Sequence, residues 1–480
     1  MVKKHVFILH GMSLLWSMLM VKMLIFIMVI WMESLKKLDY IHNLGFNAIY
    51  LNPIFYSPSA HKFDTLDFFE VDEHLGGNEA FVRLMDEVHR RDMKLVLDVS
   101  IDHTSSDAKW FNRDAVYYPD SVGACNNPNV PEREFFIFAE DGSYESWAGV
   151  GTMPKLDFTS QKLRNIIYKS EESVVKKWLK TPYNIDGWRF DVADVMAHNK
   201  DYDLYYEVWP ELYDEIKKTN PKAMILAEDL TDCSEMFLQN GFDSTMNYFG
   251  VTRPVREFLG EADLFSPKHP FLKNIPSKMT AAQLKNRINQ FMSLMPYQIA
   301  LQQFNLIDSH DVHRIYTHPD VVYDEYLGAL NLLFALPGSP NVYYGDERLL
   351  SGRYGSVEGA RFAMQFGDDL DDRAKDNLMR YKVLTNLKST EAAFIEGGYK
   401  DLSSDAYTFC FARFSDAKTY IVIFSTDDNS SEVRINLAHL GFNTDVEICE
   451  VFGEEFERYL NDIELVIQVP PHKSYLLELK

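Results

Sequence analysis

The sequence predicts an α/β fold: a parallel (β/α)8 barrel (TIM barrel) with a small inserted domain after its third strand and a C-terminal all-β sandwich. Helical and extended patterns alternate from residue 33 to about residue 385, and a loop-rich stretch interrupts them at 104–160. The helical period is then lost over 398–480. With 480 residues, of which 46% are hydrophobic, the chain can form one large domain and one or two smaller ones.

Strands that are separated by helices pair in parallel through crossover connections, so the alternation predicts a barrel. Amphipathic helices are expected over 33–45, 81–93, 161–180, 204–218, 281–293 and 323–336. Short apolar strands are expected over 48–55, 94–102, 185–192, 223–229, 244–249, 304–311 and 341–347. These strands are one short of a closed barrel, and the segment HVFILH (5–10) is the candidate for the missing first strand.

The two departures from the alternation predict the domain boundaries. Residues 104–160 follow the third barrel strand and indicate an inserted subdomain, whereas the short strands and turns of 398–480 are typical of a β-sandwich. The predicted parts are the first half of the barrel (1–103), the inserted subdomain (104–160), the second half of the barrel (161–390) and the β-sandwich (398–480).

The apolar run over residues 11–32 does not fit this scheme. Lys3 and Lys4 precede it, as in a signal peptide or a membrane anchor, but no small-residue cleavage site follows. Our preferred hypothesis is a local reading-frame error, because codons can be chosen for residues 27–33 that encode a polar, glycine-containing peptide when read one base earlier. A membrane anchor or signal and a genuine buried segment remain the alternatives.

Charge and cysteine content exclude several classes of protein. The chain carries 48 Lys and Arg against 71 Asp and Glu, a net charge of −23, so a nucleic-acid partner is not expected. The four cysteines lie far apart without a CxxC spacing, which argues against a disulfide framework and against a zinc site. The sequence therefore predicts no metal-binding residues.

Titratable side chains occur where four of the predicted strands end. In barrels of this type the reacting groups lie at the carboxyl ends of the strands, so these residues are expected to line one cleft. They are Asp98 with His103, Arg189 with Asp191, Glu228, and His310 with Asp311.

Carboxylates without metal-ligand spacing or a phosphate-binding loop favour glycoside hydrolysis, which needs one ionised and one protonated carboxyl group. Arg189 and Asp191 are two residues apart on one strand, so their side chains point to the same face and Arg189 would keep Asp191 ionised. Glu228 lies among apolar residues, and desolvation is expected to raise its pKa toward that of a general acid.

These residues stand in four motifs, DVSIDH (98–103), GWRFD (187–191), the strand ending at Glu228, and DSHD (308–311). The chain thereby resembles the α-amylase family of glycoside hydrolases, glycoside hydrolase family 13. The resemblance implies that Asp191 is the nucleophile, Glu228 the general acid/base and Asp311 the third carboxylate. It further implies that the residues that line the substrate subsite are Phe63, Asp64, His103, Arg189 and His310.

Within that family the motifs HKFDT (61–65), GACNNP (123–128) and YYGDE (343–347) look like the neopullulanase, cyclomaltodextrinase and maltodextrin glucosidase branch, and GACNNP looks most like maltodextrin glucosidase. The resemblance implies a retaining hydrolase of α-1,4-linked maltodextrins. Two alternatives stay open, a transglycosylase acting on the same substrates and a non-catalytic, membrane-anchored barrel subunit. Two departures are notable: Phe63 stands where the family usually has Tyr, and Asp102 where it usually has Asn.

The resemblance also bears on cofactors, partners and location. No cofactor is required by the sequence, but the position of Asp102 often helps to bind calcium in the family, so calcium is compatible with it. The expected partner is an oligosaccharide substrate, with no nucleic acid and no membrane, and the chain is expected to be a monomer or a homodimer. A cytoplasmic location is expected, or a membrane-anchored or exported one if 11–32 is a true apolar segment.

Overall fold

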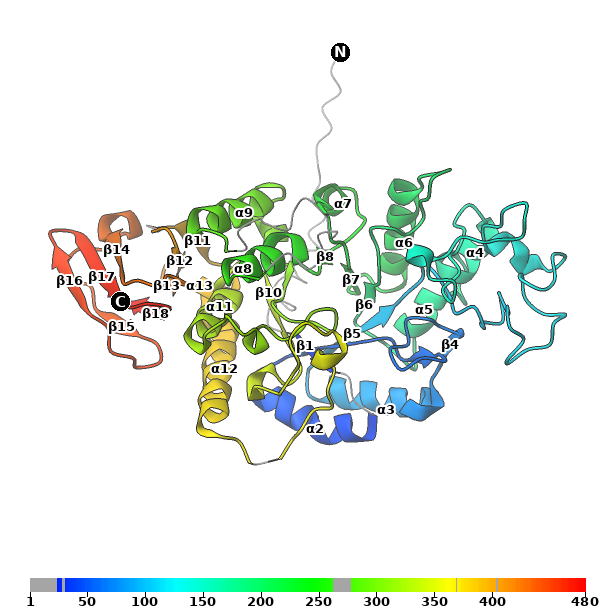
Figure 1. Cartoon of the computed structure of the whole chain (residues 1–480), viewed down its shortest axis with the longest axis horizontal. Coiled ribbons are helices and arrows are strands. Elements are labelled where there is room, and N and C mark those ends of the chain that lie inside the picture. Colours follow the sequence, from blue (N-terminus) through cyan, green and yellow to red (C-terminus); the bar gives the residue numbers. More distant parts are fainter. Residues whose placement is uncertain (1–23, 28–30, 262–277, 368, 403–404) are drawn as a thin grey trace, which may run out of the picture.

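The computed structural model describes residues 24–27, 31–261, 278–367, 369–402 and 405–480, with side chains described from residue 37 onward. Figure 1 shows a central α/β part, with the segment between β5 and β6 on one side and an all-β part on the opposite side. The all-β part contains the C-terminus.

The central part is a parallel barrel of eight strands. Its strands are β1 (Leu24–Ile27), β2 (Ala48–Leu51), β5 (Lys94–Val99), β6 (Gly187–Phe190), β7 (Met224–Ala227), β8 (Ser244–Thr245), β9 (Phe304–Asn305) and β10 (Ser339–Tyr343). They are hydrogen-bonded in the order β8-β7-β6-β5-β2-β1-β10-β9, and a parallel bridge between Met246 and Phe304 closes the ring. The predicted barrel is therefore confirmed, with strands shorter than the apolar runs suggested.

The first strand is not where the sequence placed it. Residues 5–10, which we predicted as the first strand, lie outside the described residues. The first strand of the barrel is instead β1, which pairs with β2 on one side and with β10 on the other. Because β1 and the start of α2 (Trp31–Asn43) fall within the apolar run 11–32, this part of the run belongs to the barrel. The remainder of the run lies outside the described residues, and the reading-frame hypothesis stays a hypothesis.

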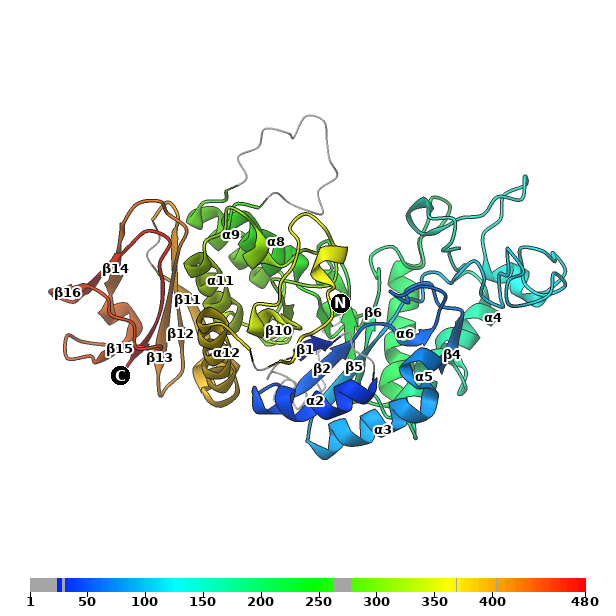
Figure 2. The ribbon, with the colours of Figure 1, turned by 60° about the horizontal axis from the view of Figure 1, so that its bottom comes forward.

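The helices surround the strands, and Figure 2 shows α2 and α3 on the outside of β2 and β5. The remaining helices after α2 are α3 (Gly77–Arg90), α4 (Gln161–Arg164), α5 (Val174–Leu179), α6 (Tyr205–Thr219), α7 (Ser234–Leu238), α8 (Arg253–Phe258), α9 (Ala281–Ser293), α10 (Tyr297–Ala300), α11 (Tyr323–Ala335), α12 (Asp372–Thr390) and α13 (Ala392–Ile395). The helix predicted over 161–180 is split into α4, a π-helical turn and α5. No prediction covered α12.

Alternate residues of each barrel strand face the interior or the helices, as strand geometry requires. Tyr50 packs in the interior cluster, whereas its neighbours Ile49 and Leu51 pack in the outer core. The same alternation places Trp188 and Phe190 in the outer core.

The segment 104–160 leaves the barrel after β5 and returns before α4. It contains isolated bridges and one-turn helices, and the rings of Phe136 and Tyr144 pack against Phe111 within the same buried cluster as the outer barrel core. Its last residues pair with the start of the segment through an antiparallel bridge between His103 and Lys155. A short hairpin of β3 (Phe55–Tyr56) and β4 (Asp67–Val71) follows β2.

The C-terminal part is an all-β domain of two antiparallel sheets, as predicted. One sheet has the order β11 (Gly398–Asp401), β12 (Thr408–Phe414), β13 (Thr419–Ser425), β18 (Ser474–Leu479) and β15 (Ile448–Glu450). The other has the order β14 (Ser431–Asn436), β17 (Glu464–Val469) and β16 (Arg458–Asn461). The first sheet packs on α11, where Gly328 leaves room for the ring of Phe424; an added Cβ would lie 2.2 Å from that ring.

Among the described residues, no helix combines the length and the apolar character needed to cross a membrane. All four cysteines are unpaired, and Cys233 and Cys410 are buried.

Candidate active site

A fully buried arginine stands at the centre of the candidate site. Nη1 of Arg189 lies 2.9 and 3.1 Å from the two carboxylate oxygens of Asp98 and 2.6 Å from Oδ1 of Asp191. Nη2 of the same guanidinium lies 2.9 Å from Oε2 of Glu228. One buried cation therefore hydrogen-bonds to Asp98 and Asp191 through Nη1 and forms an ion pair with Glu228 through Nη2, so it contacts carboxylates from three neighbouring strands.

Asp98 lies inside the barrel beneath the other two carboxylates. It is fully buried on β5 and accepts a hydrogen bond of 2.6 Å from the hydroxyl of Tyr50 on β2. Burial raises the pKa of Asp98 to about 7, although Arg189 opposes the shift. Tyr50 and Asp98 thus form a buried support for the guanidinium.

Asp191 directly follows β6, and its backbone N–H bonds to the carbonyl of Val99 at the end of β5. Burial on its own would raise the pKa of this carboxyl group. The charges of Arg189 and His103, together with hydrogen bonds from Arg189 and Glu228, lower the pKa of Asp191 below its ordinary value. The carboxylate of Asp191 is therefore held ionised.

Glu228 directly follows β7 and has the opposite character. Burial raises the pKa of Glu228 well above its ordinary value; Arg189 opposes this shift, and the nearby charges of Asp191 and Asp311 add to it. Its Oε2 accepts a hydrogen bond of 2.8 Å from the backbone N–H of Val192. Val192 has φ of +44°, a strained conformation for a β-branched residue, of the kind found at functional sites.

Asp311 and His310 lie in the loop after β9. Nε2 of His310 is 3.1 Å from Oδ2 of Asp311, and Arg361, from the segment after β10, lies 3.8 Å from Oδ1. Burial raises the pKa of Asp311 to about 6, although 30% of its side chain is exposed. Burial, with the charges of Arg189 and Arg361, lowers the pKa of His310 well below its ordinary value, so the imidazole is neutral.

The ring of Phe63 covers one side of this cluster. It stacks on the imidazole of His310 with centroids 5.5 Å apart and planes 14° apart, and the guanidinium of Arg189 lies 5.9 Å from its centroid. Asp64 accepts a hydrogen bond of 2.7 Å from Ser57 within the same loop. Asp64 is 7% exposed, so in this structure it orients the loop that carries Phe63.

His103 lies on the side of the inserted segment. Its Nε2 is 3.1 Å from the hydroxyl of Ser100, and its ring lies 5.6 Å from that of Trp147. His103 is also among the groups that lower the pKa of Asp191.

Asp102 is the position at which the sequence leaves calcium compatible, and its surroundings can be described. In the part of the chain that the structure describes, no group of three or more His, Cys, Asp or Glu side chains is arranged to hold a metal ion. Oδ1 of Asp102 faces the ammonium of Lys155 at 3.5 Å. A cationic side chain of the protein therefore lies beside Asp102.

The fold brings the predicted residues of the site together around Arg189, namely Phe63, His103, Asp191, Glu228, His310 and Asp311. Sequence reasoning missed Tyr50 and Arg361. Tyr50 carries no signal beyond its place in an apolar strand, and Arg361 lies in a segment without periodic pattern.

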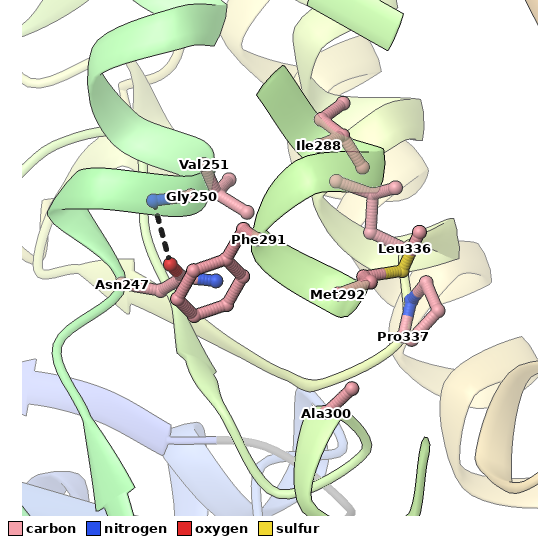
Figure 3. A pocket seen from close by; sticks show the side chains of 9 residues that line it. All are labelled: Asn247, Gly250, Val251, Ile288, Phe291, Met292, Ala300, Leu336 and Pro337. Atoms are coloured by element: carbon pink, nitrogen blue, oxygen red, sulfur yellow. Dashed lines mark hydrogen bonds between the residues drawn. The ribbon is translucent and has the colours of Figure 1, made fainter. Parts of the chain in front are cut away.

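A separate apolar pocket lies between the π-helical turn at 248–252 and α9 (Figure 3). The residues that line it carry no titratable side chain: Asn247, Gly250, Val251, Ile288, Phe291, Met292, Ala300, Leu336 and Pro337. It therefore offers no acid–base chemistry.

Fold and site together define the class of (β/α)8-barrel proteins in which acids gather at the carboxyl ends of the strands, the edge at which such barrels carry their active sites. A family model described as "Alpha amylase, catalytic domain" matches residues 34–396. The chain therefore belongs to the α-amylase family of glycoside hydrolases.

Individual relatives are distant. The chain is 28% identical over 409 residues to an amylopullulanase of Thermoanaerobacter thermohydrosulfuricus, which covers 78% of this chain and 26% of that protein. It is 28% identical over 449 residues to an intracellular maltogenic amylase of Bacillus subtilis, covering 92% of this chain and 68% of the relative. The chain thus spans about a quarter of the amylopullulanase and about two thirds of the maltogenic amylase.

Among solved structures, a debranching enzyme of Nostoc punctiforme, soaked with acarbose, has a TM-score of 0.77 and 25% sequence identity. The similarity covers 96% of this chain and 98% of that one. The likeness therefore includes the barrel, the segment 104–160 and the C-terminal domain.

Proposed function

We propose that the chain is a retaining α-glucan hydrolase that cleaves α-1,4-glucosidic bonds of maltodextrins or related oligosaccharides. The observation that carries the proposal is that Arg189 binds Asp191 and Glu228 with two nitrogens of one guanidinium while their pKa values shift in opposite directions. Retaining glycosidases need such a pair, with one ionised and one protonated carboxyl group close together.

In the first step, an ionised oxygen of Asp191 attacks the anomeric carbon. The bond from this carbon to the glycosidic oxygen breaks as Glu228 donates its proton to the leaving sugar. The result is a glycosyl ester of Asp191 and a free oligosaccharide with a new hydroxyl group.

In the second step, Glu228, now ionised, takes a proton from a water molecule whose oxygen attacks the anomeric carbon. The ester bond to Asp191 breaks, and the two inversions leave the sugar with its original α configuration. In this proposal Asp311 and the neutral His310 hold sugar hydroxyls, and the half-buried ring of Phe63 stacks on a sugar ring.

The finer assignment rests on similarity. Relatives named maltogenic amylase, cyclomaltodextrinase and amylopullulanase, and a debranching enzyme among the structures, support α-glucans as the substrate class. Within it we propose short maltodextrins, as in maltodextrin glucosidase, with segment 104–160 as an inserted subdomain beside the site. A cytoplasmic location, and a monomer or homodimer, complete the proposal.

A substrate panel tests the assignment. The purified chain is incubated with maltotriose, a cyclomaltodextrin and pullulan, and the products are separated by chromatography, with Asp191→Asn as the blank. Hydrolysis of maltotriose that is absent in the variant supports the proposal. Transfer products longer than the substrate would favour the transglycosylase, and no turnover of any α-glucan would contradict the proposed function.

A further inference from the structure

The ammonium group of Lys155 lies where three segments of the chain meet. Its Nζ donates to the carbonyl oxygens of Val195 at 2.6 Å and His198 at 2.9 Å, and it lies 3.5 Å from Oδ1 of Asp102. Lys155 lies near the end of the segment 104–160, Asp102 follows β5, and the two carbonyls belong to the loop that begins with Asp191. The side chain of Lys155 is only 11% exposed.

The partners of this ammonium are the kinds of oxygen that a calcium ion takes, two backbone carbonyls and one carboxylate. Asp102 is fully buried, and its Oδ1 makes no hydrogen bond among the described residues. The ammonium of Lys155 neutralises the negative charge at this oxygen. The ammonium donates hydrogen bonds to the two carbonyls and forms an ion pair with the carboxylate, so one cationic group interacts with all three oxygens. The ammonium and a metal ion cannot occupy this place together.

We propose that Lys155 takes the place of a bound cation at this junction. It fastens the segment 104–160 and the loop after Asp191 to the end of β5, so the chain needs no calcium to hold His103 beside Asp191. Lys155 is thus a positioning residue: it contacts neither substrate nor the reacting atoms, and it acts through the backbone of the loop that carries Asp191.

The first test is the response of the full wild-type chain to calcium. Thermal unfolding is followed after dialysis against EGTA and again in millimolar CaCl2. An ion bound only by the folded state would raise Tm by several degrees. We expect the two Tm values to agree within about 1 °C. A rise of several degrees in calcium would overturn the proposal, whether or not the chain is an active hydrolase.

The second test removes the ammonium. Lys155→Ala is expected to lower Tm by several degrees and to reduce kcat/KM on maltotriose by about tenfold or more, since the loop after Asp191 loses its anchor. This activity arm rests on the proposed function, whereas the Tm arm does not. The matched control is Lys109→Ala, an exposed lysine of the same segment, which should leave Tm and kcat/KM unchanged.

The third test asks whether the oxygens form a cation site. In Lys155→Ala they are open to a metal ion, and millimolar CaCl2 is expected to recover part of the lost Tm. In Lys155→Met the longer apolar side chain still fills the place, and no recovery is expected. Recovery in neither variant, or an unchanged Tm in Lys155→Ala before calcium is added, would contradict the proposal.

Discussion

Nη1 of Arg189 lies 2.6 Å from Oδ1 of Asp191, two residues further along the chain. Because β6 ends between them, the arginine points into the barrel while the carboxylate stands at its rim. The contact holds Asp191 ionised in a buried place, where burial alone would favour the protonated form. A nucleophile needs that ionised state, so the account of the site depends on this pair.

Replacing Arg189 tests how much this arginine contributes to the stability of the folded protein. Arg189→Met leaves the buried Asp98, Asp191 and Glu228 without their shared cation, and we expect the free energy of unfolding to fall by about 3–5 kcal/mol. Urea unfolding at neutral pH measures the loss. Arg83→Met, at an exposed position on α3, is the control and should change the stability by less than about 0.5 kcal/mol. An equally small change in Arg189→Met would show that the contacts of the guanidinium contribute little to the stability of the fold.

The pH dependence of activity tests the assignment of Glu228. Its raised pKa keeps the acid protonated at pH values where an ordinary glutamate is ionised, so kcat/KM on maltotriose should fall as the pH rises through that pKa. With an aryl α-glucoside that has a good leaving group, Glu228→Gln should retain activity and lose this alkaline limb. An alkaline limb that persists in Glu228→Gln would assign the general acid to another group.

The stacked pair of Phe63 and His310 makes a prediction about substrate binding. Phe63→Ala removes the ring, and we expect kcat/KM on maltotriose to fall about tenfold, the effect of about 1.4 kcal/mol of aromatic contact. Phe63→Tyr keeps the ring and should stay within about threefold of the wild type. Equal losses in both variants would indicate that the position acts through the loop and not through the ring.

The position of the first strand can be tested with proline. Ile25 pairs with Ile49 on one side and Val342 on the other, so Ile25→Pro removes a backbone donor from the ladder and should lower Tm by several degrees or prevent folding. Ile8→Pro, within the segment first expected to form this strand, is the comparison and should be tolerated. The reverse ranking would restore 5–10 as the first strand.

Most of the barrel could be predicted because its strands are apolar runs that end in acids. Asp191 and Glu228 follow their strands directly, and the closure of the barrel brings them together without further information. The first strand was misplaced because 5–10 and 24–27 are both apolar, and periodicity cannot choose between two runs of the same kind.

The parts of the site that could not be predicted depend on contacts between distant segments. Arg361 reaches Asp311 from the segment after β10, and Lys155 reaches the carbonyl of Val195 from the end of the inserted segment. Neither Lys155 nor Arg361 lies in a sequence pattern that indicates such a partner. A backbone carbonyl has no side-chain signature, so the sequence alone did not indicate that Lys155 lies beside Asp102.

The anomeric form of the first product tests the central claim most directly. The wild-type chain is mixed with maltotriose, and the anomeric protons of the products are followed by NMR from the first seconds, with Asp191→Asn in parallel. The account predicts that α-anomeric glucose or maltose appears before mutarotation and that the variant releases none. Initial release of the β-anomer, or undiminished release by Asp191→Asn, would contradict a retaining mechanism with Asp191 as the nucleophile.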